Sequence, residues 1–194
     1  MRLSLRMTAI VLIAVAAPHA RAGIIADSIA DFSLVQGQDG WSYGFYDETD
    51  GAPYNPAGFT QFDVANAPDN NWKASDALVP SPPGPGEENN TFLSINAVGG
   101  HPTGVDIDGQ DRILWAIRRF QSSLAGPVSI AYDIHKLNTT NLNGGGITGR
   151  IFVDGVEKLT QFIANADGTG VQGVLTVPVS VGSLIDFVID PLGV

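Results

Sequence analysis

Apolar residues recur at every second position through most of the chain from Gly23 onward. The clearest run is "PVSIAYDIHK", in which Val128, Ile130, Tyr132 and Ile134 alternate with small or polar residues. A β-strand points successive side chains to opposite faces, so this run predicts a strand with one buried and one wet face. An amphipathic helix would need a period of 3.6, which this chain lacks over most of its length. The periodicity therefore predicts an all-β fold.

Turn dipeptides separate the periodic runs. Asp154-Gly155 lies between "GITGRIFV" and "VEKLTQFI", and this dipeptide favours a type I′ hairpin. Asp167-Gly168 precedes "VQGVLTVPVSV", and Gly182-Ser183 precedes "LIDFVID". Pro178 lies inside a strand pattern, which predicts an edge strand or a bulge because proline cannot donate to a sheet ladder.

Shorter strands are predicted upstream, in "WSYGFYD", "GFTQF" and "TFLSIN". "RILWAIRRFQS" could form a helix or a strand, and the alternation of Ile113, Trp115 and Ile117 favours the strand. Together these runs predict an antiparallel β-sandwich of jelly-roll type with about eight strands. Residues 63–90 contain "PSPPGPG" and are expected to form an irregular insert, a long loop rich in Pro and Gly. Residues 23–194, with this insert included, are expected to form a single β-sandwich domain.

The first 22 residues are expected to be a cleaved secretory signal peptide. Arg2 and Arg6 precede the apolar stretch "MTAIVLIAVAA", and "ARA" then provides a cleavage site after Ala22. The apolar stretch is shorter than the ~20 residues that a membrane-spanning helix needs. No second long apolar segment follows, so the mature chain is expected to be secreted, without a membrane span.

Charge and cysteine content restrict the partners further. The chain has 20 acidic and 10 basic residues. Three of the basic residues lie in the leader, so the mature chain has seven bases against 20 acids and a net charge of −13. Such a charge disfavours nucleic acid and anionic lipid, and favours cations or neutral glycans. There is no Cys, so stability must come from packing or from bound cations.

The sequence offers little catalytic chemistry. The mature chain has only His101 and His135, with no Gly-x-Ser-x-Gly motif and no cysteine nucleophile. Two carboxylates could still meet in space as a glycosidase pair. The expectation is a protein that is not an enzyme.

A structural Ca²⁺ ion is the one cofactor considered. "VDIDGQD" fails as an EF-hand loop, because the position that requires glycine is Asp111. Ca²⁺ can also bind carboxylates from separate loops. The candidate ligands are acids near predicted strand ends: Asp31, Asp39, Asp47 and Asp190. The alternative is a set of solvated acids.

Aromatic residues suggest glycan binding, since sugars present C–H faces that lie against exposed rings. In "WSYGFYD" the rings of Trp41, Tyr43 and Phe45 share one face and are expected to lie in the core. Tyr46 lies on the other face beside Gly44, and it is expected to be exposed. Tyr54 and Trp72 lie in predicted loops, and they complete the candidate set of exposed rings.

Two consecutive arginines add a polar candidate. Arg118 and Arg119 must point to opposite faces of their strand. One is expected to pair with an acid such as Asp186 or Asp190, and the other to be free. Arg118 is included among the candidate ligand-binding residues.

The motifs "VQGQDGWSYGFYD", "WAIRRFQS", "AGPVSIAYDIHK" and "VGSLIDFVIDP" together resemble a module of secreted bacterial proteins, of planctomycete type. The resemblance covers most of residues 35–191 and implies a jelly-roll, carbohydrate-binding-like domain. Two departures stand out: Phe120 replaces a second Trp, and the chain stops at "IDPLGV", where similar modules continue with an acidic closing segment. The resemblance therefore also implies that a last strand or cation ligands are missing.

These observations predict an exported, non-catalytic protein that binds polysaccharide at the cell surface or in the extracellular matrix. The alternatives are a purely structural or protein-contacting surface module and, less favoured, a glycan-active enzyme. Binding requires at least two of Tyr46, Tyr54 and Trp72 to be exposed on one surface. The structural alternative requires them to be buried.

Overall fold

The fold was analysed in a computed structural model that describes residues 23–75, 77–79, 93–103, 112–140 and 145–191. The predicted signal peptide, the "PSPPGPG" segment and the "VDIDGQD" segment lie outside these residues. The described residues form antiparallel β-sheets and two short 3₁₀ turns, η1 (Gln38–Gly40) and η2 (Pro56–Gly58), with no α-helix. The chain is therefore all-β in its described parts, as the two-residue periodicity predicts.

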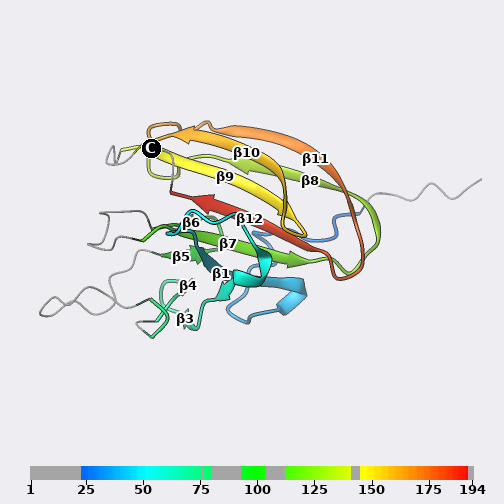
Figure 1. Cartoon of the computed structure of the whole chain (residues 1–194), viewed down its shortest axis with the longest axis horizontal. Helices are drawn as coiled ribbons and strands as arrows, with labels where there is room; N and C mark the ends of the chain where they lie inside the picture. Colours follow the sequence, from blue (N-terminus) through cyan, green and yellow to red (C-terminus); the bar gives the residue numbers. More distant parts are fainter. Residues whose placement is uncertain (1–22, 76, 80–92, 104–111, 141–144, 192–194) are drawn as a thin grey trace, which may run out of the picture.

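The largest element is a six-stranded sheet with the order β10-β9-β12-β7-β1-β2 (Figure 1). Its strands are β1 (Trp41–Asp47), β2 (Thr60–Gln61), β7 (Leu114–Gln121), β9 (Gly146–Val153), β10 (Val156–Ala164) and β12 (Leu184–Asp190). β7 pairs with β1 on one side and with β12 on the other, so "RILWAIRRFQS" supplies a central strand and not a helix.

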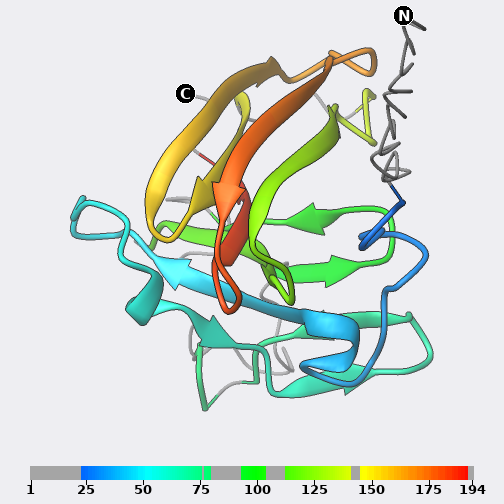
Figure 2. The same cartoon turned by 90° about the vertical axis from the view of Figure 1, so that its right-hand side faces the viewer.

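Two smaller sheets complete the fold. A four-stranded sheet has the order β3-β4-β5-β6, and a two-stranded ribbon joins β11 to β8. These strands are β3 (Val64–Asn66), β4 (Asn71–Lys73), β5 (Ser94–Asn96), β6 (Gly100–His101), β8 (Gly126–Ile134) and β11 (Val171–Val179). Figure 2 shows the β8–β11 ribbon beside the β9–β10 hairpin.

One face of the six-stranded sheet, called here the inner face, carries the main hydrophobic core. Trp41, Tyr43 and Phe45 of β1 point into this core, as their alternation predicts. The four-stranded sheet covers the β1 side, where the Trp72 ring stacks 6.3 Å from the ring of Tyr43. The β8–β11 ribbon contributes Ile130 and Val177 to the same core, and it contacts β9 at Gly149, where an added Cβ would lie 2.7 Å from Ile134 Cγ2.

Local turn chemistry matches the predictions from sequence. Asp154 and Gly155 both have positive φ, 50° and 80°, as a type I′ turn between β9 and β10 requires. Pro178 lies in β11, which pairs only with β8 and is therefore an edge strand. Its missing N–H consequently removes no bond from a central ladder.

Two expectations about the strands need correction. The described residues contain twelve strands, where about eight were expected. The supposedly irregular insert at 63–90 contains β3 and β4, and Trp72 at the centre of β4 is buried. These strands have only three residues each, which is too short for a two-residue period to be recognised.

Strand pairing also differs from the simplest interpretation of the chain order. β11 follows β10 in sequence, yet it pairs with β8 along nine residue pairs. The antiparallel sheets agree with the predicted fold class, while jelly-roll connectivity stays a prediction. Within the described ranges, the structure has no helix with the length and apolar character needed to cross a bilayer.

Candidate functional site

The three aromatic residues expected to bind a ligand do not form an exposed surface. Tyr46 is only 7% exposed and Trp72 only 5%, while Tyr54 is half-buried. Trp72 belongs to the core of the inner face, where its Nε1 donates to the carbonyl of Ser33 at 2.8 Å. Tyr46 and Tyr54 lie on the opposite face, called here the outer face, with ring centroids 4.9 Å apart. The expected exposure of Tyr46 and Trp72 is therefore wrong.

The connection between β1 and β2, residues 48–59, explains why Tyr46 is covered. This segment, called here the β1–β2 loop, folds back over the outer face. A Cβ added to Gly58 would lie 2.8 Å from Tyr46 Cε2, so the loop backbone packs directly on that ring. The Phe59 ring covers Gly44 in the same way, at 2.7 Å from the position of an added Cβ. Alternation along β1 assigns Tyr46 to the outer face correctly, but it carries no information about the loop that covers this face.

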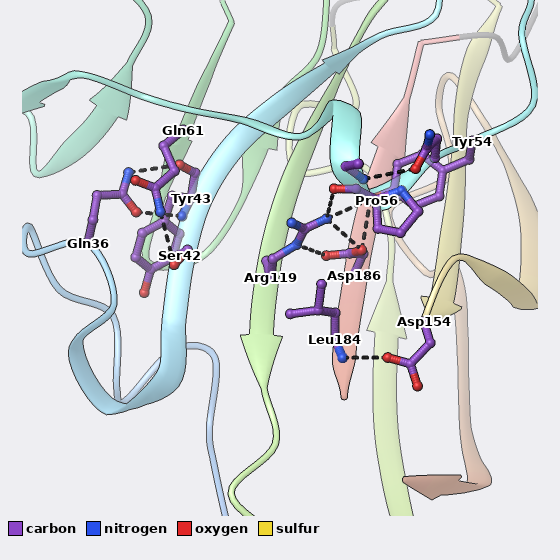
Figure 3. Close-up of polar contacts among 12 residues, drawn as sticks. Gln36, Ser42, Tyr43, Tyr54, Pro56, Gln61, Arg119, Asp154, Leu184 and Asp186 are labelled. Atoms are coloured by element: carbon purple, nitrogen blue, oxygen red, sulfur yellow. Dashed lines mark hydrogen bonds and ion pairs between the residues drawn. The ribbon is translucent and has the colours of Figure 1, made fainter. Parts of the chain in front are cut away.

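The β1–β2 loop is anchored by a buried ion pair. Arg119 Nε lies 2.7 Å from Asp186 Oδ1, with the arginine side chain 13% exposed and the aspartate fully buried. The Tyr54 hydroxyl donates to Asp186 Oδ2 at 2.8 Å, and Arg119 Nη2 donates to the Pro56 carbonyl at 3.0 Å (Figure 3). The guanidinium also lies 4.1 Å from the centroid of the Phe59 ring. This pairing agrees with the expectation that one of the two arginines bonds Asp186 or Asp190.

Arg118, the other arginine, is not free for a ligand. Its guanidinium donates to the carbonyls of Ser28, Asn96 and Gly99, at 2.9, 2.6 and 3.2 Å. Burial lowers the pKa of this guanidinium. Arg118 therefore holds the N-terminal segment and the β5–β6 turn against the sheet, and its expected role in ligand binding is not supported by this geometry.

The four candidate calcium ligands do not come together. Asp39 and Asp47 flank opposite ends of β1, and Asp31 accepts the backbone N–H of Asp27 at 2.7 Å. Asp190 is fully buried and bonded to Arg150 at 2.9 Å. Within the described part of the chain, no three His, Cys, Asp or Glu residues are placed to hold a metal ion. These four residues are therefore not a shared site in this structure.

The outer face does have an open pocket at the edge of the β1–β2 loop. Its cavity volume is about 380 Å³. Its wall on one side is the loop, from Gly51 to Tyr54, and on the other it is the β9–β10 hairpin. The residues that line it are Glu48, Gly51, Ala52, Pro53, Tyr54, Trp115, Arg150, Phe152, Gly155 and Glu157. Aromatic, cationic and anionic side chains therefore meet in one depression, called here the outer-face pocket.

Three rings in mutual contact form the apolar part of the outer-face pocket. The Tyr54 ring lies 4.4 Å from that of Phe152 and 5.9 Å from that of Trp115, centroid to centroid. Trp115 is 5% exposed, and its indole Nε1 is buried without a hydrogen-bond partner among the described residues. A buried N–H without a partner costs free energy, so a ligand oxygen that displaced the atoms covering Trp115 Nε1 would recover that cost.

Arg150 provides the polar part of the pocket. Its Nε donates to Asp190 Oδ2 at 2.9 Å, and its Nη1 donates to Glu157 Oε1 at 3.1 Å. The guanidinium lies 5.4 Å from the Trp115 ring centroid. These contacts fix the guanidinium beside the rings, so this side of the pocket is preorganised.

The titration of Tyr54 gives a test of how firmly the loop is seated. Burial and the negative charge of Asp186 raise the pKa of the Tyr54 hydroxyl above its usual value of about 10. Because of the raised pKa, the folded state binds the proton of the Tyr54 hydroxyl more tightly than the unfolded state does. The neutral hydroxyl therefore contributes its full stability below pH ~10, and this contribution is lost as the pH rises further. We expect the denaturation midpoint of the wild type to fall more steeply above pH ~10 than that of Tyr54→Phe. Parallel midpoint curves between pH ~8 and ~11 would show that Tyr54 is not held as described.

Sequence reasoning missed most of the outer-face pocket. Trp115 and Phe152 were placed on strands, but not identified as neighbours. Register could have suggested the cluster, because Tyr46 lies directly opposite Trp115 in the β1–β7 pair. That register becomes visible only once the strand order is known, and β1 and β7 are far apart in the chain.

Comparison of the chain with known proteins found no match to a protein family, to a curated protein or to a solved structure. The resemblance to a secreted carbohydrate-binding-like module is supported only as far as its all-β character. The outer-face pocket is therefore the feature of the molecule that points to a function.

Proposed function

We propose that the chain is an exported, non-catalytic β-sandwich of jelly-roll type that binds polysaccharide at the cell surface or in the extracellular matrix, and that the outer-face pocket is the binding site. The predicted leader supports export. The packing of the ribbon and the four-stranded sheet on the inner face supports a layered fold, and leaves the pocket on the opposite face.

The observation that carries the proposal is an open pocket in which the half-buried ring of Tyr54 lies beside carboxylates and next to Trp115, whose buried indole N–H has no partner among the described residues. A pyranose ring has apolar C–H faces that pack on aromatic rings, and hydroxyls that accept or donate hydrogen bonds. Tyr54, which is half-buried, supplies ring surface, while the carboxylates of Glu48 and Glu157 can accept from hydroxyls. A volume of about 380 Å³ lies within the range of small-ligand pockets.

Binding is favoured over catalysis because the described lining residues of the pocket include no Ser, Cys or Lys paired with a base. Both histidines lie outside it, and the Arg150 guanidinium is held by carboxylates on two sides. Glu48 and Glu157 are the only carboxylates among the described lining residues, so they are the pair that a glycosidase reaction would have to use.

Replacing Trp115 by phenylalanine tests the site directly. This variant keeps an aromatic ring and loses the N–H. We expect the affinity for a polysaccharide that the wild type binds to fall about 2–10-fold, the effect of one hydrogen bond. The matched control is Trp41→Phe. Trp41 also has an unpartnered Nε1, but it packs against Phe120 in the core of the inner face. Equal affinity of Trp115→Phe and wild type would remove Trp115 from the site.

The measurement is retention on a panel of immobilised polysaccharides, with and without a chelator. Retention on none of them would refute the binding proposal. Loss of retention with chelator would support the calcium prediction. New reducing ends in the incubated polysaccharide would identify an enzyme instead.

A structural or protein-contacting module is the second candidate, and the burial of Tyr46 and Trp72 favours it. Under this alternative the rings of Tyr54, Trp115 and Phe152 only stabilise the β1–β2 loop. Trp115→Phe would then change thermal stability without changing retention on any polysaccharide.

A further inference from the structure

The outer-face pocket carries more negative than positive charge. Glu48 and Glu157 line it, and Arg150 is the only base among the described lining residues. Asp190 lies behind Arg150, fully buried, and bonds it through both Nε and Nη2. Asp190, Glu157 and Glu48 carry three negative charges in and behind the pocket against the one positive charge of Arg150, so the local formal charge is −2.

Arg150 is consequently not available to a negatively charged ligand. Its Nε and Nη2 are bonded to Asp190 and its Nη1 to Glu157. An anionic sugar would have to displace Glu157 and approach Asp190. The mature chain, at −13, adds long-range repulsion of the same sign.

Glu48 shows the negative potential of the pocket most clearly. Partial burial raises the pKa of its carboxyl, and the charge of Asp190 raises it further. Arg150 lowers this pKa and Asp47 raises it. Burial and neighbouring negative charge therefore disfavour the ionised form of Glu48. A cation bound beside the Glu48 carboxylate would relieve this cost and would itself be stabilised.

We propose that the outer-face pocket selects a saccharide that carries a positive charge, namely an amino sugar with a free amine. The inference rests on the proposed function and narrows its ligand class. The half-buried ring of Tyr54, with Ala52 and Pro53 beside it in the pocket wall, accepts the apolar face of the sugar, and Glu48 and Glu157 receive the ammonium group. A bare metal ion fits less well, because within the described residues no three acids converge and the rings offer no ligands.

Oligomers of glucosamine and of N-acetylglucosamine provide the sharpest comparison, since the two share a backbone and differ in charge. At pH ~6 a carboxylate is ionised and an amine is protonated. We expect the glucosamine oligomer to bind about tenfold tighter by calorimetry, the size of one charge-assisted hydrogen bond. We expect a galacturonan oligomer of equal length, which is anionic, to show no binding.

Two variants that each remove one negative charge test whether the preference for the glucosamine oligomer arises in the outer-face pocket. Glu48→Gln is expected to lower the affinity ratio between the two oligomers by about 3–10-fold, because one carboxylate is lost. It should also raise the melting temperature slightly at pH ~7, since the raised pKa means that ionised Glu48 opposes folding. A gain in stability together with lost selectivity excludes misfolding as the cause. The control, Asp69→Asn, removes an equal charge on the β3–β4 turn, where Asp69 is exposed and 3.8 Å from Lys73, and should leave the ratio unchanged.

The outcomes separate the two levels of the proposal. Binding of neutral oligomers without preference for the amine would overturn the amino-sugar inference and leave the proposed function standing. Absence of binding to every oligomer and polysaccharide would overturn both. A trilysine peptide that bound as tightly as the glucosamine oligomer would show that the pocket recognises the amine of a polypeptide, and would overturn the saccharide assignment.

Discussion

Replacement of Asp186 by alanine is expected to destabilise the protein by about 3–5 kcal/mol, the usual effect of removing one partner of a buried ion pair. Asp186 is fully buried, and the side chain of Arg119 is 13% exposed. The variant would leave the guanidinium without a carboxylate and the Tyr54 hydroxyl without its acceptor. Urea denaturation followed by tryptophan fluorescence measures the change.

Asp69→Ala is the matched control for this prediction. Asp69 also forms an ion pair, with Lys73 at 3.8 Å, but its side chain is 61% exposed. Surface pairs contribute about 0–1 kcal/mol, so the control should unfold almost as the wild type does. If the two variants lost similar stability, the Arg119–Asp186 pair would not be the anchor that the structure indicates.

Asp186→Ala should also affect the outer-face pocket. Tyr54 and Pro56 belong to the β1–β2 loop, and both bond the Arg119–Asp186 pair. Without Asp186 we expect faster amide exchange in residues 48–59, and weaker retention on any polysaccharide that the wild type binds. Replacing both partners, by Arg119→Met with Asp186→Leu, should cost less stability than Asp186→Ala, because no buried charge is left unpaired.

Replacement of Arg118 by methionine is the second large effect, with an expected loss of about 2–4 kcal/mol. Methionine can fill much of the volume, but the carbonyls of Ser28, Asn96 and Gly99 would lose the guanidinium as a donor, while that of Gly99 would keep a second one, the N–H of Asn96. Ser28 lies in the N-terminal segment, which is also held by the Gln36 side chain donating to the Tyr43 carbonyl at 2.8 Å. We therefore expect limited proteolysis to cut residues 23–35 faster in this variant.

Arg118→Lys separates charge from geometry. Lysine keeps the positive charge, but it cannot span three carbonyls in the way that a planar guanidinium does, so it should restore only part of the lost stability. Polysaccharide retention per folded molecule should be unchanged in both variants. Loss of retention with normal stability would return Arg118 to the ligand-binding role expected from sequence.

Much of the fold could be predicted from local pattern. Alternation identified the strand around Trp41, Tyr43 and Phe45 and its buried face, and it favoured a strand over a helix for β7. Asp154-Gly155 predicted a hairpin because both residues of a type I′ turn need positive φ, and the structure has it. These successes share a cause: each depends on backbone geometry within a few residues.

The candidate site was predicted less well, again for one physical reason. Tyr46 lies on the expected face of β1, but the β1–β2 loop covers it. Trp72 was expected in a loop, yet it is at the centre of β4 and bonds Ser33. The exposure of a ring depends on what packs over it, and those segments lie elsewhere in the chain.

The sequence by itself determined that the chain after residue 22 forms strands, which residues of each strand share a face, and where the tight turns lie. Side-chain alternation and turn chemistry are properties of neighbouring residues. The tertiary structure alone decided that β11 pairs with β8 and that β1 pairs with β7. It also decided that Arg119 and Asp186 anchor a loop beside Trp115, Arg150 and Glu48. Those contacts join residues distant in sequence. Their energies depend on burial and on hydrogen-bond and ion-pair partners, which are in place only after the sheets have packed.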